Sequence, residues 1–110
     1  MQENQYIKSI SVKELKHKLD QGENIQILDV RQLDEYQFCN LKGIHIPLGD
    51  LAHRLNELDK KQPLAVLCHS GGRSARATFL LQNEGFEEVC NITGGITAWS
   101  HEIDPRVPLY

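Results

Sequence analysis

The chain has 110 residues, of which 40% are hydrophobic and 25% are charged. This length and composition are those of one globular domain with its own core, so they exclude two ordinary domains and wholesale disorder. The net charge of -3 argues against a general nucleic-acid-binding protein, because phosphate binding needs an excess of Lys and Arg.

The chain contains three cysteines, Cys39, Cys68 and Cys90, which lie far apart in the sequence. An odd number without a Cys-x-x-Cys spacing favours free thiols in a reducing compartment over a disulfide scaffold or a zinc site. The first ten residues hold no apolar run, and no stretch reaches membrane-spanning length. We therefore expect a cytoplasmic protein that does not bind a membrane, and a monomer, since the charge is moderate and no apolar patch stands out.

The first half of the chain alternates helix and strand signals. Ser11 is expected to cap a helix by accepting a hydrogen bond from the amide of Glu14, and Gly22 ends this helix. An apolar run over residues 25–30 predicts a strand. Further elements predicted in this half are a short helix at residues 32–38, a strand at 44–46, and one helix with the apolar stripe Leu48, Leu51, Leu55 and Leu58.

The second half continues the alternation. Residues 64–67 form an uninterrupted apolar run, which predicts a strand buried on both faces. A largely buried helix is predicted at residues 74–83, a last strand at 89–92 and a final helix at 96–101. This pattern favours an α/β domain with a mainly parallel sheet and helices on both faces. Ligands of such sheets bind beyond the carboxyl ends of the strands, which directs attention to the residues after Leu67.

A cysteine loop begins at that point. Cys68 ends the predicted strand, and Gly71 and Gly72 allow a tight loop whose backbone N–H groups point inward. The loop leads into a helix N-terminus, which favours an anion, and Arg73 adds a fixed positive charge. Each of these features favours a thiolate over a thiol, so we predict that Cys68 is a reactive nucleophile. The same loop would hold the anionic oxygens of a substrate.

Each of these residues also has a structural alternative. A cysteine at a strand end is often only a small buried hydrophobic residue, and Arg73 could be the charge partner of an acidic side chain. His69 could be a base or a substrate contact, or a solvent-facing loop residue. Cys39 and Cys90 are expected to be structural, because a resolving role would require their Cα atoms to lie within roughly 4.4–6.8 Å of that of Cys68.

The segment Cys-x-x-Gly-x-Arg-Ser at a strand-to-helix turn resembles the active-site loop of rhodanese-homology domains. Residues 102–110 resemble the tail of those rhodanese domains that are fused behind E1-like adenylating enzymes of sulfur-carrier pathways. In total the resemblance covers about residues 11–99. Further segments that agree with the family are Leu28-Asp29-Val30-Arg31 with Glu35-Tyr36, Ile44-His45-Ile46-Pro47-Leu48 and Gly94-Gly95-Ile96-Thr97-Ala98-Trp99.

The resemblance implies a single rhodanese-like domain over residues 1–110, with a core at about 7–103, a short tail at 104–110 and a five-stranded, mainly parallel sheet. It also implies a sulfurtransferase in which Cys68 carries sulfane sulfur as a persulfide. The sulfur donor would be thiosulfate or a protein persulfide, and the acceptor would be cyanide, a thiol or a sulfur-carrier protein. No metal or organic cofactor is implied. Whether the chain stands alone or belongs to a larger protein stays open.

The resemblance also assigns roles around Cys68. The residues expected to bind the substrate are those of the loop: His69, Ser70, Gly71, Gly72, Arg73 and Ser74. Asp29 and Arg31 would either support this loop or form a buried ion pair within the fold.

Two other functions compete with this interpretation. Cysteine-dependent phosphatases and arsenate reductases use a Cys-x5-Arg loop that surrounds a tetrahedral anion. The interval from Cys68 to Arg73 is one residue shorter, so it would form a smaller ring that suits a persulfide sulfur better. A non-catalytic rhodanese-like binding module usually lacks the cysteine, which is present here.

Overall fold

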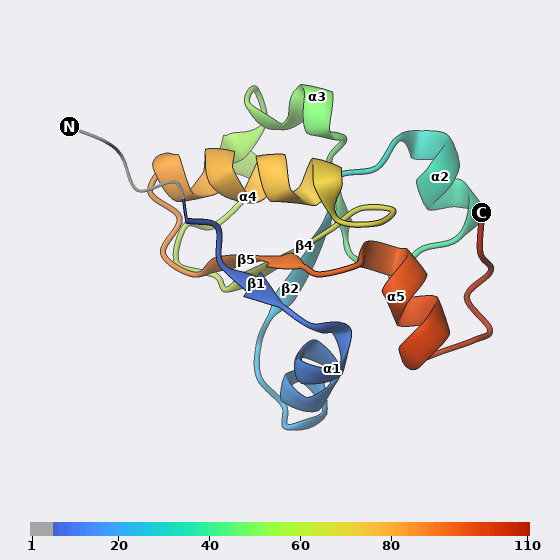
Figure 1. Ribbon diagram of the computed structural model, residues 1–110. Coiled ribbons are helices and arrows are strands. Elements are labelled where there is room, and N and C mark those ends of the chain that lie inside the picture. Colours follow the sequence, from blue (N-terminus) through green and yellow to red (C-terminus); the bar gives the residue numbers. More distant parts are fainter. Residues whose placement is uncertain (1–5) are drawn as a thin grey trace.

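The computed structural model describes residues 6–110, which form a five-stranded sheet with helices on both sides (Figure 1). The predicted domain span of 1–110 includes residues 1–5, which lie outside the described residues. The elements in chain order are β1 (Ser9–Ile10), α1 (Val12–Asp20), β2 (Gln26–Asp29), α2 (Leu33–Phe38), β3 (Ile44–His45), α3 (Leu48–Leu51), the 3-10 helix η1 (Leu55–Glu57), β4 (Leu64–Leu67), α4 (Gly72–Asn83), β5 (Val89–Ile92) and α5 (Gly95–Glu102).

The sheet has the strand order β1-β5-β4-β2-β3, and every neighbouring pair is parallel. The predicted α/β class with a parallel sheet is therefore confirmed. All four residues of the central strand β4 are buried. Because the strands are parallel, their carboxyl ends share one edge of the sheet, and Cys68 follows the central strand at that edge. The short edge strand β1 had no signal in the sequence.

The four apolar residues of β4 contribute to the hydrophobic cores on both faces of the sheet. Successive side chains of a strand point to opposite faces, so Leu64 and Val66 pack with α3 and α4, while Ala65 and Leu67 pack with α1 and α5. Figure 1 shows α3 and α4 above the sheet and α1 and α5 below it. This arrangement explains why β4 lacks the alternation of polar and apolar residues that a half-exposed strand shows.

The structure corrects the prediction of a single helix over the leucine stripe. Helix α3 ends at Leu51, the backbone turns at Arg54 (φ -124°), and η1 follows as a separate turn. All four leucines of the stripe nevertheless contact the core cluster beneath α4. Isolated helices this short are only marginally stable in water, so packing of the leucines decides the local backbone here.

The residues just before α1 and α4, Ser11 and Gly71, set where these two helices begin. The hydroxyl of Ser11 accepts the amide of Glu14 at 3.0 Å, as predicted. Helix α4 starts at Gly72, two residues earlier than predicted, because Gly71 takes a left-handed conformation (φ 118°) that a side chain would disfavour. Gly72, Arg73 and Ser74 therefore lie in the first turn of α4. Within residues 6–110, the helices are too short and too polar to cross a membrane.

Candidate active site

The thiol of Cys68 lies between the end of β4 and the first turn of α4. Cys68 is buried, with 1% of its surface exposed. Its Sγ accepts the backbone N–H of Gly71 at 3.1 Å and lies 3.2 Å from the hydroxyl of Ser74. Both groups belong to the predicted loop, so the structure brings Cys68, Gly71 and Ser74 together.

The carbonyl groups of the same loop are held by α5. The amide of Ile96 donates to the carbonyl oxygen of Cys68 at 2.9 Å, and the amide of Thr97 donates to that of His69 at 3.1 Å. A Cβ on Gly95 would lie 2.5 Å from both of these oxygens, so only glycine permits this approach. The Gly94-Gly95 segment therefore allows α5 to approach and hold the carbonyl groups of the cysteine loop, although it lies 26 residues further along the chain.

The hydroxyl beside the Cys68 thiol is itself hydrogen-bonded to the neighbouring strand β5. Ser74 is buried, and its hydroxyl donates to the Oδ1 of Asn91 on β5. Asn91 pairs in register with Val66, two residues before Cys68. The sequence analysis did not identify Asn91. The sequence offered one signal for it, a polar amide within an otherwise apolar strand, and that strand pairs with the one that leads to Cys68.

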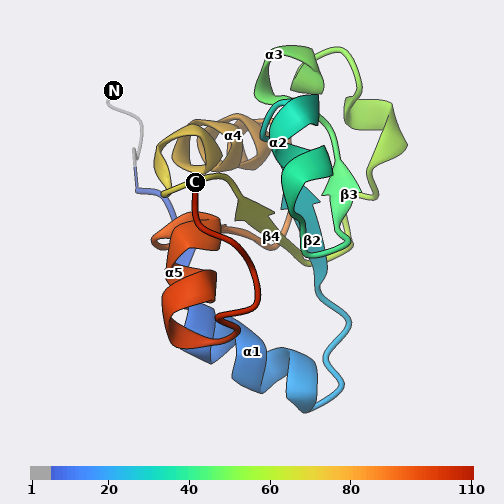
Figure 2. The ribbon, with the colours of Figure 1, turned by 90° about the vertical axis from the view of Figure 1, so that its right-hand side faces the viewer.

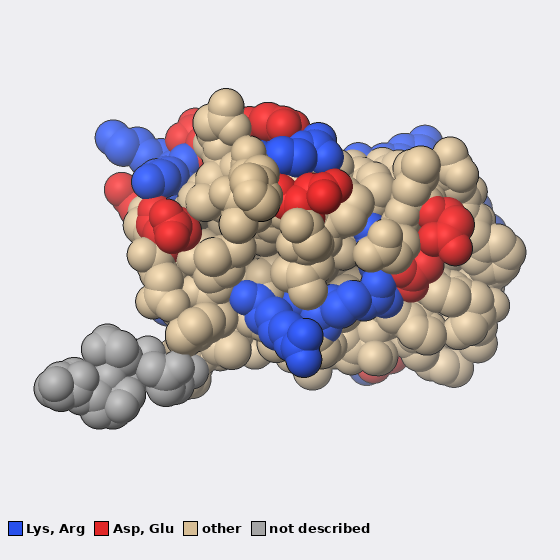
Figure 3. All heavy atoms as spheres, turned by 90° about the horizontal axis from the view of Figure 1, so that it is seen from above, with Lys and Arg blue, Asp and Glu red and all other residues tan. Residues whose placement is uncertain are grey.

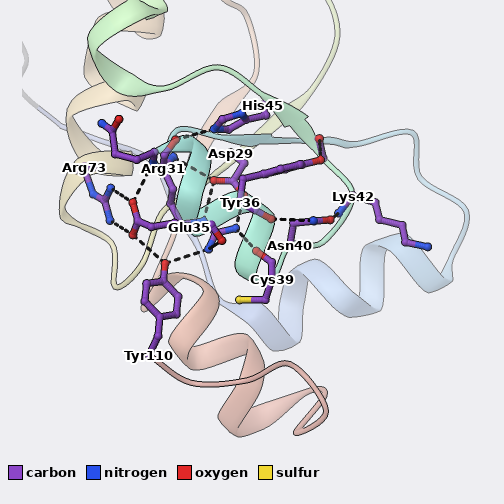
Figure 4. Close-up of polar contacts among 12 residues, drawn as sticks. Asp29, Arg31, Glu35, Tyr36, Cys39, Asn40, Lys42, His45, Arg73 and Tyr110 are labelled. Carbon is purple, nitrogen blue, oxygen red and sulfur yellow. Dashed lines mark hydrogen bonds and ion pairs between the residues drawn. The ribbon is translucent and has the colours of Figure 1, made fainter.

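Arg73 forms a bidentate ion pair with Glu35 of α2. Its Nη1 and Nη2 lie 2.7 and 2.9 Å from the two carboxylate oxygens (Figure 4). Hydrogen bonds from Arg73 lower the pKa of Glu35 to about 2, aided by the amide of Gln32 and the hydroxyl of Tyr110. The same hydrogen bonds raise the pKa of Arg73 above its ordinary value. The arginine predicted to bind the substrate is therefore the charge partner of an acidic side chain, which was the structural alternative that the sequence left open.

Asp29 and Arg31 form a second ion pair, which is wholly buried. Their closest oxygen and nitrogen atoms are 2.7 Å apart, and neither side chain is exposed. Burial lowers the pKa of Arg31, but hydrogen bonds with Asp29 and Tyr110 outweigh it and raise the pKa above its ordinary value. Arg31 also donates to the carbonyl oxygen of Glu35 within α2 and to that of Cys39, the C-cap of α2. The pair therefore reaches the loop indirectly, through α2, which carries Glu35, and through Tyr110, which stacks on His69.

The loop residue His69 meets the tail of the chain. Its ring stacks on the ring of Tyr110 with 4.2 Å between the centroids, and its Nε2 lies 2.9 Å from the main-chain oxygen of Tyr110. Ser70 and Gly72 are exposed on the outer side of the loop. Glu35 was noted in the sequence only as part of a motif, and Tyr110 only as part of the tail, so neither was identified as a partner of the loop.

The chain has two cysteines besides Cys68. Cys39 and Cys90 are free thiols, and burial raises the pKa of Cys90 above its ordinary value. Among residues 6–110, no group of three or more His, Cys, Asp and Glu side chains is placed to hold a metal ion. Figure 3 shows Lys and Arg interspersed with Asp and Glu over the face formed by α3 and α4.

Comparison with known families and proteins agrees with this geometry. Residues 11–102 match the family described as "Rhodanese-like domain". The solved structure of a rhodanese-like domain protein from Staphylococcus aureus superposes with a TM-score of 0.80 at 30% sequence identity, covering 94% of this chain and 99% of that one.

Relatives of the chain differ in length. The Bacillus subtilis protein named "Putative sulfur carrier protein YrkF" is 39% identical over 86% of this chain, which spans about half (51%) of that protein. "Putative sulfurtransferase YtwF" of the same organism is 35% identical over 91% of this chain and 97% of its own length. "Adenylyltransferase and sulfurtransferase MOCS3-1" of Zea mays is 36% identical over 92% of this chain, which spans 23% of that protein. The last match agrees with the resemblance found for residues 102–110.

Proposed function

The chain belongs to the rhodanese-like domain family, and from that premise we propose that it is a sulfurtransferase in which Cys68 carries a sulfane sulfur as a persulfide. The single observation that carries the proposal is the position of the Cys68 Sγ. It accepts the amide of Gly71 and lies beside the hydroxyl of Ser74, at the N-terminal turn of α4. A helix N-terminus and backbone N–H groups stabilise a thiolate and the anionic persulfide that follows it. Names of relatives as sulfurtransferase and sulfur carrier agree with this chemistry.

In the first half-reaction, the Cys68 thiolate attacks the outer sulfur of a donor such as thiosulfate. A new S–S bond forms between the two sulfur atoms. The bond between the outer sulfur and the sulfonate group breaks, and sulfite leaves with the electron pair of that bond. The charge on the protein sulfur is unchanged, because one anionic sulfur replaces another. A persulfide on another protein would react in the same way and leave as a thiolate.

In the second half-reaction, a nucleophilic acceptor attacks the outer sulfur of the persulfide. Cyanide would leave as thiocyanate, and a thiol on a small molecule or on a sulfur-carrier protein would leave as a persulfide. The S–S bond to Cys68 breaks, and the thiolate is restored with the electron pair. No electrons enter or leave the cycle, so the proposed reaction needs no redox cofactor.

The roles of the neighbouring residues follow from their contacts. The amide of Gly71 would stabilise the sulfur anion in both states, and the hydroxyl of Ser74, which donates to Asn91, would position the sulfur by contact. Arg73 would bind the sulfonate oxygens of thiosulfate by exchanging one of its contacts with Glu35. Asp29 and Arg31 are positioning residues that hold α2. We also propose that the chain acts as a single cytoplasmic domain, with its core at about 7–103 and its tail at 104–110.

Mass spectrometry after incubation with thiosulfate tests the proposal. We expect a gain of one sulfur atom that maps to Cys68 and is released by cyanide. Cys68→Ser should remove both the added sulfur and the transfer activity, because serine forms no persulfide, whereas Cys39→Ser and Cys90→Ser are matched controls that should keep them. If neither thiosulfate nor a small organic persulfide loads Cys68, or if all three variants lose activity equally, the proposal is wrong.

A further inference from the structure

The tail of the chain, residues 104–110, lies over the outer side of the cysteine loop. After α5 it is held by the amide of Asp104, which donates to the carbonyl oxygen of Trp99 at 2.9 Å, and by the hydroxyl of Ser100, which donates to that of Val107 at 2.6 Å. Figure 1 shows its end beyond the tip of the loop between β4 and α4, and Figure 2 shows that end in front of the same loop. The two views place the end of the tail beyond the tip of the loop, while the rest of the tail runs beside α5.

Tyr110 makes the contacts between the tail and the loop. Its ring stacks on His69, the residue after the nucleophile, and meets the ring of Phe38 edge-on with 5.8 Å between the centroids. Its hydroxyl donates to the Oε2 of Glu35 at 2.9 Å and accepts from the Nη1 of Arg31 at 3.0 Å (Figure 4). Since Glu35 also binds Arg73, Tyr110 is linked to both ends of the loop that surrounds Cys68.

These contacts hold the ring firmly while leaving part of it in solvent. The hydroxyl bonds to two charged partners, and such hydrogen bonds are stronger than neutral ones. Nevertheless 44% of Tyr110 is exposed, and the neighbouring Leu109 is 54% exposed. Leu109 and Tyr110 belong to neither hydrophobic core cluster, so they can move away from the loop without unfolding the domain. Tyr110 is therefore placed to obstruct the loop reversibly.

We propose that Tyr110 determines which sulfur donors and acceptors reach Cys68, because its ring covers the loop and admits small linear molecules more readily than bulky ones. This proposal rests on the proposed function only for the sulfur-transfer step. Cys68 is 1% exposed, and the outer loop residues His69 and Arg73 are those that Tyr110 holds directly or through Glu35, so a reactant that reaches Cys68 past these residues meets Tyr110. A larger partner would have to displace the tail first.

Three variants separate the ring, the hydroxyl and the rest of the tail. Tyr110→Ala removes the ring and the hydroxyl together. Tyr110→Phe keeps the stacked ring and removes only the hydroxyl, so it should keep most of the selectivity. Leu109→Ala changes an exposed neighbour that the catalytic proposal does not use and serves as the matched control. Thermal melting of each variant shows whether the domain remains folded.

The first measurement is the alkylation rate of Cys68, followed by mass spectrometry, with iodoacetamide as the small reagent and fluorescein maleimide as the bulky one. In Tyr110→Ala the ratio of the bulky rate to the small rate should rise by about tenfold or more, since steric discrimination in a site is typically of this size. In Leu109→Ala the ratio should stay within about twofold, as for ordinary surface substitutions. An unchanged ratio in a folded Tyr110→Ala, or an equal acceleration of both reagents, overturns the proposal.

The second measurement compares sulfur transfer from loaded Cys68 to cyanide and to reduced glutathione. Tyr110→Ala should raise kcat/KM for glutathione relative to cyanide by about tenfold, and Tyr110→Phe by less than about threefold. If Cys68 takes up no sulfur in any variant, the proposed function fails, while the alkylation ratio still decides the role of Tyr110. If sulfur is transferred but the ratio is unchanged, the role of Tyr110 is disproved and the proposed function stands.

Discussion

Two arginine–carboxylate pairs lie side by side near the nucleophile, and they differ in burial. Asp29 and Arg31 are two residues apart in the sequence, and both side chains are wholly buried. Glu35 and Arg73 are 38 residues apart, and their side chains are 17% and 32% exposed. The hydroxyl of Tyr110 contacts one member of each pair, so the two pairs form a single polar network (Figure 4).

The difference separates a structural pair from an exchangeable one. The five N–H groups of Arg31 are matched by oxygens of Asp29, Glu35, Cys39 and Tyr110, which leaves no donor for a substrate. Breaking a buried pair leaves an uncompensated charge in the interior, whereas a partly exposed pair can trade one partner for another or for water. We therefore expect the buried pair to determine stability and the exposed pair to affect activity.

The largest expected effect comes from breaking the buried pair. Arg31→Ala should lower the free energy of unfolding by about 3–5 kcal/mol, because Asp29 is left buried without a counter-ion. Urea denaturation followed by circular dichroism measures this loss. Arg31→Lys should recover only part of the stability, since one ammonium group cannot replace five directed N–H groups. A loss similar to that of a surface substitution would show that the buried pair is not structural.

The next effect concerns activity at the exposed pair. Arg73→Ala should reduce kcat/KM for thiosulfate by roughly ten- to a hundredfold, chiefly through KM, because a charge-assisted contact contributes about 1.5–3 kcal/mol. Arg73→Lys should recover part of the loss. Steady-state kinetics with thiosulfate and cyanide test this, with Arg76→Ala, an exposed arginine one turn along α4, as the matched control. A change of less than about threefold would assign Arg73 to structure alone.

The exposed pair should also make stability depend on pH. The folded-state pKa of Glu35, about 2, lies below its ordinary value of 4.5. The pair therefore contributes its full stability above about pH 4.5 and loses it as the pH falls toward 2. Glu35→Gln should cost about 1 kcal/mol at pH 7, since solvent screens a partly exposed pair, and its difference from wild type should vanish near pH 2. Denaturation curves between pH 7 and pH 2 measure the free energy of unfolding of both proteins. A difference between wild type and Glu35→Gln that stays constant with pH would contradict the lowered pKa of Glu35.

The smallest expected effect comes from the neutral contact of the thiol. Ser74→Ala removes the hydroxyl beside the Cys68 Sγ and should lower kcat/KM by about fivefold, since a neutral hydrogen bond contributes about 1 kcal/mol. The control is Thr78→Val, which loses a hydrogen bond to the carbonyl oxygen of Ser74 but none to the sulfur. Equal loss in both variants would attribute the effect to the packing of α4 rather than to the sulfur.

Local sequence patterns predicted the parts of the site that are local in the chain. Cys68, Gly71 and Ser74 were identified because a strand, two glycines and a helix start within a few residues fix their geometry through backbone conformation alone. The partners of this loop could not be found in the same way. Glu35, Asn91 and Tyr110 come from α2, β5 and the tail, and only the packing of those segments brings them to the loop.

Local sequence patterns were sufficient to predict the order and type of most elements, the parallel sheet and the place of Cys68 after the central strand. These follow from apolar periodicity and from glycine conformations, which act over a few neighbouring residues. Contacts between distant segments were needed to show that the leucine stripe breaks into α3 and η1, that Arg73 pairs with Glu35, and that Tyr110 stacks on His69. In each case a side chain had several local alternatives of similar free energy, and contacts with distant segments selected one of them.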